Sequence, residues 1–180
     1  MKRFYLGSIV IVVFVFAGCG YTTRSTLSKE FKTIYIAPVE NKIDITQEAD
    51  MGNRYRLYKP QLETKLTQAI INRFLTDGNL RPNASDTSDL MLKTALVEFR
   101  QDPLRYDDND EVMEYRVTLR VQMSLRDNRQ GEGIWQEDSF SGEATYITPG
   151  HSGARSQDVA IDEAISDLAR RIVERTIEAW

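Results

Sequence analysis

The 180-residue chain is 41% hydrophobic and 28% charged, with a formal net charge of −4, a composition typical of a single globular domain. The acidic balance lacks the basic excess that a broad nucleic-acid surface requires, so we expect no nucleic-acid partner. One Cys and one His exclude an internal disulfide and a structural zinc site with four N or S ligands.

Residues 1–18 have the order of a signal peptide. Two basic residues open the chain, an apolar run follows as far as Val15, and the small residues Ala17 and Gly18 precede Cys19. Charge, a short apolar run and a small-residue cleavage site are the three parts of such a signal. The alternative is a single-pass membrane anchor, because the run approaches the roughly 17-residue lower limit of a span. An anchor, however, has no need of small residues followed by Cys.

The segment Phe16-Ala17-Gly18-Cys19 resembles the bacterial lipobox, with Phe in place of the commoner Leu. The resemblance implies that Cys19 is acylated and becomes the mature N-terminus, attached to a membrane through its acyl chains. Gly20, where an inner-membrane lipoprotein of enteric bacteria has Asp, favours the outer membrane. We therefore expect a signal peptide at 1–18, an acylated N-terminus and tether at 19–32, and one domain at 33–180.

The first half of the domain predicts a strand and a helix. Residues 33–39 are β-branched and aromatic, as in a strand, whereas 42–58 show no sustained period. From Pro60, apolar residues recur every three or four positions, which predicts an amphipathic helix that stops at Gly78. Residues 81–89 are typical of a loop.

The second half predicts three strands and a closing helix. Residues 90–99 form the next predicted strand, and in 115–125 every odd position is apolar and every even one polar, as in a sheet with one face on the core. Residues 126–133 suit a hairpin turn, and 134–147 the returning strand. The last helix begins at about Ser156, a suitable N-cap.

The order of these elements is β-α-β-β-β-α. Four strands and two helices, with both helices on one face of the sheet, predict an α+β two-layer sandwich.

Catalytic and metal-binding motifs are weak. His151 is the one residue that could act as a general base near neutral pH without tuning, but it lies in a loop of small residues, and no G-x-S-x-G motif is present. The acidic run 106–111 lacks the Gly and Glu that a calcium loop has at its sixth and twelfth positions, so we interpret it as a solvated hairpin loop. We expect no enzyme, no metal and no cofactor.

The remaining signal is basic. Arg116 and Arg120, together with Arg126, lie on the polar face of the alternating strand, Lys93 belongs to the strand before it, and Arg100 and Arg105 follow that strand. Arginine can bind phosphate through two hydrogen bonds, so this face could accept a phosphorylated glycolipid or an acidic protein. The alternative is a face that only keeps the sheet soluble.

Several segments together resemble the lipopolysaccharide-assembly lipoprotein family LptE. They are Cys19-Gly20-Tyr21, "IYIAPVEN" (34–41), "LETKLTQAIINRF" (62–74), "EYRVTLRVQMSLRD" (114–127) and "DVAIDEAISDLARRIVERTIEAW" (158–180). The resemblance implies an outer-membrane lipoprotein that plugs the lumen of a large β-barrel, LptD, helps to assemble that barrel, binds lipopolysaccharide and aids its insertion at the cell surface. It also implies lipopolysaccharide-binding roles for Arg105 and Arg155, in the loop before the "EY" strand and just before the last helix. Each could instead be a solvated loop arginine.

Two other functions remain open at this point. One is a lipoprotein that activates a cell-wall synthase, although the tether of about 12 residues is short for crossing peptidoglycan. The other is a secreted hydrolase, which the absence of a nucleophile–base pair disfavours.

Overall fold

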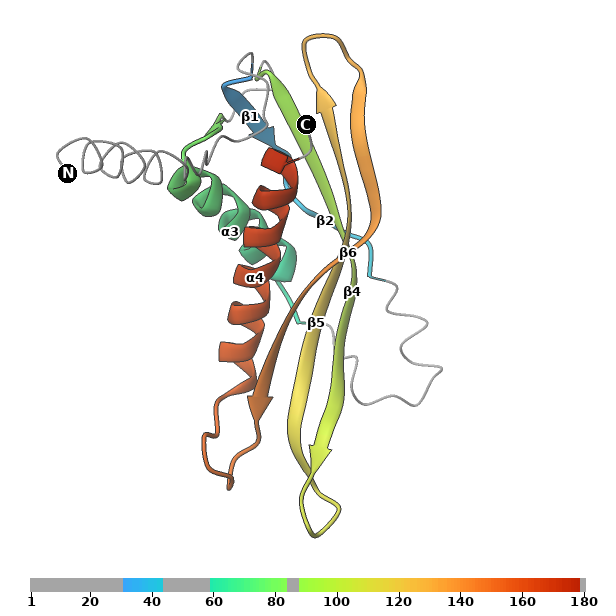
Figure 1. Ribbon diagram of the computed structural model, residues 1–180. Coiled ribbons are helices and arrows are strands. Elements are labelled where there is room, and N and C mark those ends of the chain that lie inside the picture. Colours follow the sequence, from blue (N-terminus) through green and yellow to red (C-terminus); the bar gives the residue numbers. More distant parts are fainter. Residues whose placement is uncertain (1–30, 44–58, 84–87, 179–180) are drawn as a thin grey trace, which may run out of the picture.

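The computed structural model describes residues 31–43, 59–83 and 88–178. Its elements, in chain order, are β1 (Thr33–Ile36), β2 (Glu40–Asn41), α3 (Leu62–Asp77), β3 (Arg81–Pro82), β4 (Leu90–Tyr106), β5 (Val112–Asp127), β6 (Gly133–Ile147) and α4 (Gln157–Glu178). Figure 1 shows both helices on the same face of a long, twisted sheet. The predicted α+β class is confirmed. Among the described residues, no helix combines the length and apolarity needed to cross a membrane.

The sheet has six strands, so the prediction of four was wrong. Its strand order is β3-β1-β4-β5-β6, and β2 also pairs with β4. β1 runs parallel to β3 and β4, whereas β5 is antiparallel to both β4 and β6. The predicted β-α-β-β-β-α order missed β2 and β3 because each is a pairing of two residues, too short to produce an alternating pattern.

β4 extends to Tyr106, well past its predicted end at Phe99. A register shift between Leu96 and Glu98 marks a β-bulge, and a bulge changes which residues face the core. Before it, Leu92 and Leu96 are fully buried; after it, the buried residue is Phe99. The single alternating pattern breaks at this point, which is why the sequence appeared to end the strand.

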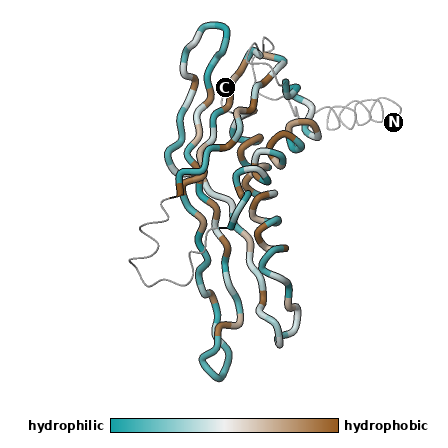
Figure 2. Tube along the Cα trace, turned by 180° about the vertical axis from the view of Figure 1, so that it is seen from behind, coloured by the Kyte–Doolittle hydropathy of each residue, from teal (hydrophilic) through white to brown (hydrophobic). Residues whose placement is uncertain are grey.

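The core lies between the sheet and the helices. The odd-numbered residues of β5 from Val117 to Leu125 are at most 2% exposed, which confirms the predicted alternation. They pack in one cluster with residues of α3 and α4, among them Phe74 and Leu168. Burial of a side chain of this size stabilises the fold by about 1.5–3 kcal/mol. The β4–β5 and β5–β6 turns at the two ends of the molecule are hydrophilic (Figure 2).

The helix ends follow the sequence signals with one difference. Gly78 ends α3 with a φ of 79°, and its N–H donates to the Phe74 carbonyl, while Ser156 caps α4 by accepting the Val159 N–H at 3.3 Å. Both predictions are confirmed. α3, however, begins at Leu62 and not at Pro60, because Gln61 takes a left-handed φ of 69°.

α4 lies against β6 and covers the edge of that strand. Gly142 is buried beneath Leu168. The Asp167 carboxylate accepts the Glu143 N–H at 3.3 Å, and the Arg171 guanidinium donates to the Ser141 carbonyl. Side chains of the helix thus satisfy backbone groups that a neighbouring strand would otherwise pair.

Candidate functional site

The β4–β5 turn is held together by Asp107. Its Oδ1 accepts the backbone N–H groups of Asn109 and Glu111, both at 2.9 Å, and Asp110 takes a left-handed φ of 61°. The N–H groups of Glu111 and Asn109 hold the pKa of the Asp107 carboxyl below its ordinary value. The acidic run is therefore a shaped turn. Within the described residues, no group of three or more His, Cys, Asp or Glu could hold a metal ion.

His151 joins this turn to the β6–α4 loop. Its Nε2 lies 3.5 Å from Asp107 Oδ2, and its Nδ1 lies 3.2 Å from Thr148 Oγ1. The Thr148 N–H in turn donates to the Met113 carbonyl at 2.9 Å. Residues 107–111 and 148–156, which we name the two-loop tip, therefore lie at one end of the molecule (Figure 1).

Arg105 and Arg155 lie at this same end. Arg105 is on β4 and not in a loop as predicted, because β4 pairs with β5 beyond it, Arg105 opposite Glu114. Its Nε is 2.5 Å from the Glu114 carboxylate, and Arg155 Nη1 is 2.6 Å from Glu163. Both arginine side chains are just over half exposed, at 56% and 52%. The structure thus brings two accessible arginines to one end, each already paired with a carboxylate.

Arg116 and Arg120 lie on the face of the sheet opposite the helices, which we name the helix-free face. Arg120 is 2.8 Å from Glu98 on β4, and Arg116 is 3.5 Å from Glu143 on β6. These ion pairs cross between neighbouring strands, so carboxylates on β4 and β6 balance the basic side chains of β5.

Arg100 extends the same charge-balanced pattern. Its guanidinium lies 2.7 Å from Asp102 and 3.5 Å from Glu98. The bulge after Leu96 places these β4 carboxylates beside the β5 arginines. Sequence reasoning missed Glu98 because an unbroken alternation from Leu92 and Leu96 would place it on the core face, and it missed Asp102 because the predicted strand ended at Phe99.

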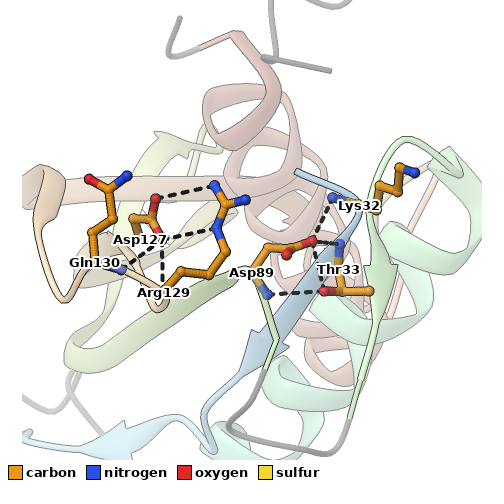
Figure 3. A network of polar contacts seen from close by, with 6 residues as sticks. All are labelled: Lys32, Thr33, Asp89, Asp127, Arg129 and Gln130. Carbon is orange, nitrogen blue, oxygen red and sulfur yellow. Dashed lines mark hydrogen bonds and ion pairs between the residues drawn. The ribbon is translucent and has the colours of Figure 1, made fainter. Parts of the chain in front are cut away.

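A second polar network holds the start of β1 (Figure 3). Asp89 Oδ2 accepts the backbone N–H groups of Lys32 and Thr33, at 2.8 and 2.9 Å, and the Thr33 hydroxyl at 3.0 Å. The Lys32 N–H in particular lowers the pKa of Asp89. Nearby, Arg129 pairs with Asp127 and lies 4.6 Å above the ring of Phe31. The N-terminal segment therefore joins the domain at the end opposite the two-loop tip. No sequence motif indicated this network.

Cys19 and the rest of residues 1–30 lie outside the described residues, as does the tract 44–58. The lipid attachment at Cys19 stays a prediction from the sequence.

Three similar solved structures are distant in sequence. Protein XCC0632 from Xanthomonas campestris is 13% identical, with 88% of this chain and 93% of that chain covered and a TM-score of 0.53. Protein CT253 from Chlamydia trachomatis is 15% identical, with 81% and 95% covered and a TM-score of 0.50. The rare lipoprotein B from Shewanella oneidensis is 14% identical, with 79% and 92% covered and a TM-score of 0.47. At such identities the first two show the fold alone.

The sequence itself identifies the family. No curated protein matches it significantly. The family model described as "LptE: Lipopolysaccharide-assembly" matches residues 31–176. This range contains all the strands and helices described above except the last two residues of α4. The chain therefore belongs to the lipopolysaccharide-assembly family LptE.

Proposed function

We propose that this protein is an outer-membrane lipoprotein that occupies the lumen of an LptD-type β-barrel, helps to assemble it, and binds lipopolysaccharide on its way to the cell surface. Residues 1–18 are removed, and acyl chains on Cys19 hold the domain at the membrane. The protein, like its family, is not an enzyme. Its membership of the LptE family carries the proposal.

The surface of the domain supports a place inside a barrel. The lumen of a large outer-membrane barrel is polar and water-filled, so a protein within it needs a polar exterior. The half of the helix-free face around Arg116 and Arg120 meets this need with alternating charges, in the Arg120–Glu98 and Arg116–Glu143 pairs. A face that is already charge-balanced can lie against a polar wall without leaving an isolated charge.

The two-loop tip supports lipid binding. Arg105 and Arg155 are exposed at one end, and Leu104 and Tyr106, which flank Arg105, are exposed as well. Guanidinium groups bind phosphate through charge-assisted hydrogen bonds, and apolar neighbours suit the rest of an amphipathic lipid.

A lipid phosphate at the tip has to compete with the carboxylates that pair with these arginines. Glu163 is 44% exposed and its ion pair with Arg155 is screened by water, whereas Glu114 is 16% exposed. Exposed ion pairs contribute about 0–1 kcal/mol, so a phosphate displaces Glu163 at little cost. We therefore expect Arg155 to bind first and Arg105 to strengthen the contact.

The partner is tested by purification. The acylated protein, extracted from outer membrane in mild detergent, should bring down one large β-barrel protein. Recovery of a peptidoglycan synthase in its place would support the cell-wall alternative and contradict this proposal.

The lipid site is tested by charge reversal. Arg105→Asp combined with Arg155→Asp should weaken binding to lipopolysaccharide micelles by at least about tenfold, since each lost charge-assisted contact contributes about 1.5–3 kcal/mol. The matched control is Lys32→Asp combined with Arg81→Asp, the same charge change in exposed side chains at the opposite end. Equal binding by both double variants would show that the tip is not the site.

A further inference from the structure

The helix-free face has a second half with a different character, on the β1 side of the bulge. It contains an open hollow of about 380 Å³ between β2 and the three long strands. The polar side chains around it are Glu40, Lys42, Lys93, Gln122, Ser124 and Gln136. Pockets that hold small ligands have volumes of about 300–1,000 Å³, so this hollow is large enough for a sugar unit.

The hollow follows from the backbone. Its floor is Ala95, a small residue that is 7% exposed. β1 and β2 pair with β4 on either side of Ala37 and Pro38, and the N–H groups of Ala37 and Lys42 donate to β4 carbonyls at 3.0 and 2.8 Å. β2 is therefore fixed as a rim beside the floor.

Donor side chains form a row across the floor. Lys93 on β4 lies opposite Ser124 on β5, which lies opposite Gln136 on β6. Gln122 lies beside Ala95 in the next position of the same face. The Gln136 amide also donates to Asp138 at 2.7 Å, and its carbonyl oxygen is left for another partner. Hydroxyl and amide groups in such a row suit the hydroxyl groups of a sugar.

Lys93 differs from the arginines of the other half. Among the described residues no carboxylate pairs with it, whereas Arg100, Arg116 and Arg120 each have a carboxylate within 3.5 Å. Lys42 is 3.2 Å from Glu40, the one acidic side chain among the described lining residues, and both are more than half exposed. The described lining therefore has two cations and one anion, and the exposed Lys93 ammonium is available to an anion from outside.

We propose that this hollow binds a saccharide that carries a phosphate group. The Lys93 ammonium meets the phosphate as a point charge, while Gln122, Ser124 and Gln136 bind the sugar hydroxyls. The site is separate from the two-loop tip, so the proposal goes beyond lipid binding by Arg105 and Arg155 and can fail independently of it.

The experiment titrates the full mature chain in detergent, labelled with ¹⁵N, with the phosphorylated oligosaccharide of fully deacylated lipopolysaccharide. The side-chain amide signals of Gln122 and Gln136 should shift in a saturable way. Lys93→Gln should weaken the affinity by roughly tenfold, the loss of one charge-assisted contact, and should leave the urea midpoint unchanged because Lys93 is exposed. Lys32→Gln, an equal loss of charge outside the hollow, should bind as the parent does.

Two further arms separate this site from its alternatives. After phosphatase treatment of the oligosaccharide, the parent and Lys93→Gln should bind it with the same affinity. The Arg105→Asp/Arg155→Asp variant should bind the untreated oligosaccharide as the parent does. The proposal is overturned if no saturable shift occurs, if Lys93→Gln binds as the parent does, if the tip variant loses the shifts, or if a muropeptide that carries only carboxylates binds better.

Discussion

Gly142 is the position at which the smallest change should disturb the fold most. A Cβ added there would lie 2.5 Å from the Leu168 Cβ and 2.6 and 2.7 Å from its backbone N and Cα. Carbon atoms pack at about 3.5–4.0 Å, so Gly142→Ala requires α4 to move away from β6 by about 1 Å. Two of the three opposing atoms belong to the helix backbone, and no side-chain rotation can relieve the contact.

The expected loss of stability follows from two opposing effects. Overpacking of a buried contact costs about 1–3 kcal/mol. Replacing Gly by Ala also stabilises the folded state by about 0.4–1 kcal/mol, because it lowers the conformational entropy of the unfolded chain. Because α4 also carries fully buried residues such as Ala164, Leu168 and Ile172, its retreat loosens the whole helix–sheet contact. We therefore expect a net loss near the upper end of the difference between these two effects, about 2 kcal/mol, equivalent to a Tm lower by roughly 4–8 °C in a domain of this size.

Urea unfolding followed by circular dichroism measures this difference. The matched control is Gly133→Ala in the same strand, where an added Cβ meets nothing within 4 Å, and that variant should be as stable as the parent or more stable by up to about 1 kcal/mol. If Gly142→Ala also unfolds at the parent's urea midpoint, α4 does not pack on β6 at the distance described here and the reasoning is wrong.

Two further predictions concern the two ends of the domain. Asp89→Ala removes the acceptor of three hydrogen bonds to Lys32 and Thr33 and should cost about 2–3 kcal/mol in urea unfolding. Because folding lowers the pKa of Asp89, its contribution is present above the ordinary carboxyl pKa of about 4 and is lost as the pH falls further. The parent should therefore lose more stability on acidification than Asp89→Ala, and equal pH profiles would contradict this. At the tip, His151→Ala should speed hydrogen exchange at the Ala154 amide, which donates to the His151 carbonyl, and should leave the urea midpoint unchanged. The control is Ser152→Ala in the same loop. If the two variants exchange this amide at the same rate, the His151 side chain does not order the loop.

The sequence predicts best where one physical pattern acts alone. In β5, alternation between a core face and a solvent face runs without interruption, so 115–125 was placed correctly and the strand proved only slightly longer. Gly78 and Ser156 were likewise found because caps depend on local backbone chemistry.

The same reasoning fails where pairing with a distant segment decides the structure. β3 exists because Arg81 and Pro82 lie beside Thr33 and Ile34, and β4 continues past Phe99 because β5 pairs with it. The carboxylate partners of the candidate arginines are set by the register between strands. Glu143, for example, reaches Arg116 because it lies opposite Thr118, the next residue of β5 on the same face. No local pattern contains that information, and a charge pattern along one strand therefore overstates how basic a sheet face is.

The length of the domain connects the proposed anchor with the proposed site. Asp89 holds the start of the domain beside the first residue of β4, Leu90, and Arg105 lies near the other end of that strand. The 15 residue steps from Leu90 to Arg105 span about 50 Å at about 3.3 Å per residue. A bilayer with its headgroups is about 40–45 Å thick. If acyl chains on Cys19 attach the tether to the periplasmic leaflet of the outer membrane, a domain that lies parallel to the membrane keeps Arg105 and Arg155 near that same leaflet. A domain standing upright in a barrel lumen instead carries the two arginines to the level of the outer leaflet. Only the upright arrangement places the proposed lipid-binding end at the leaflet where the proposed function requires it, so the proposed anchor, plug and tip support one another through the length of β4.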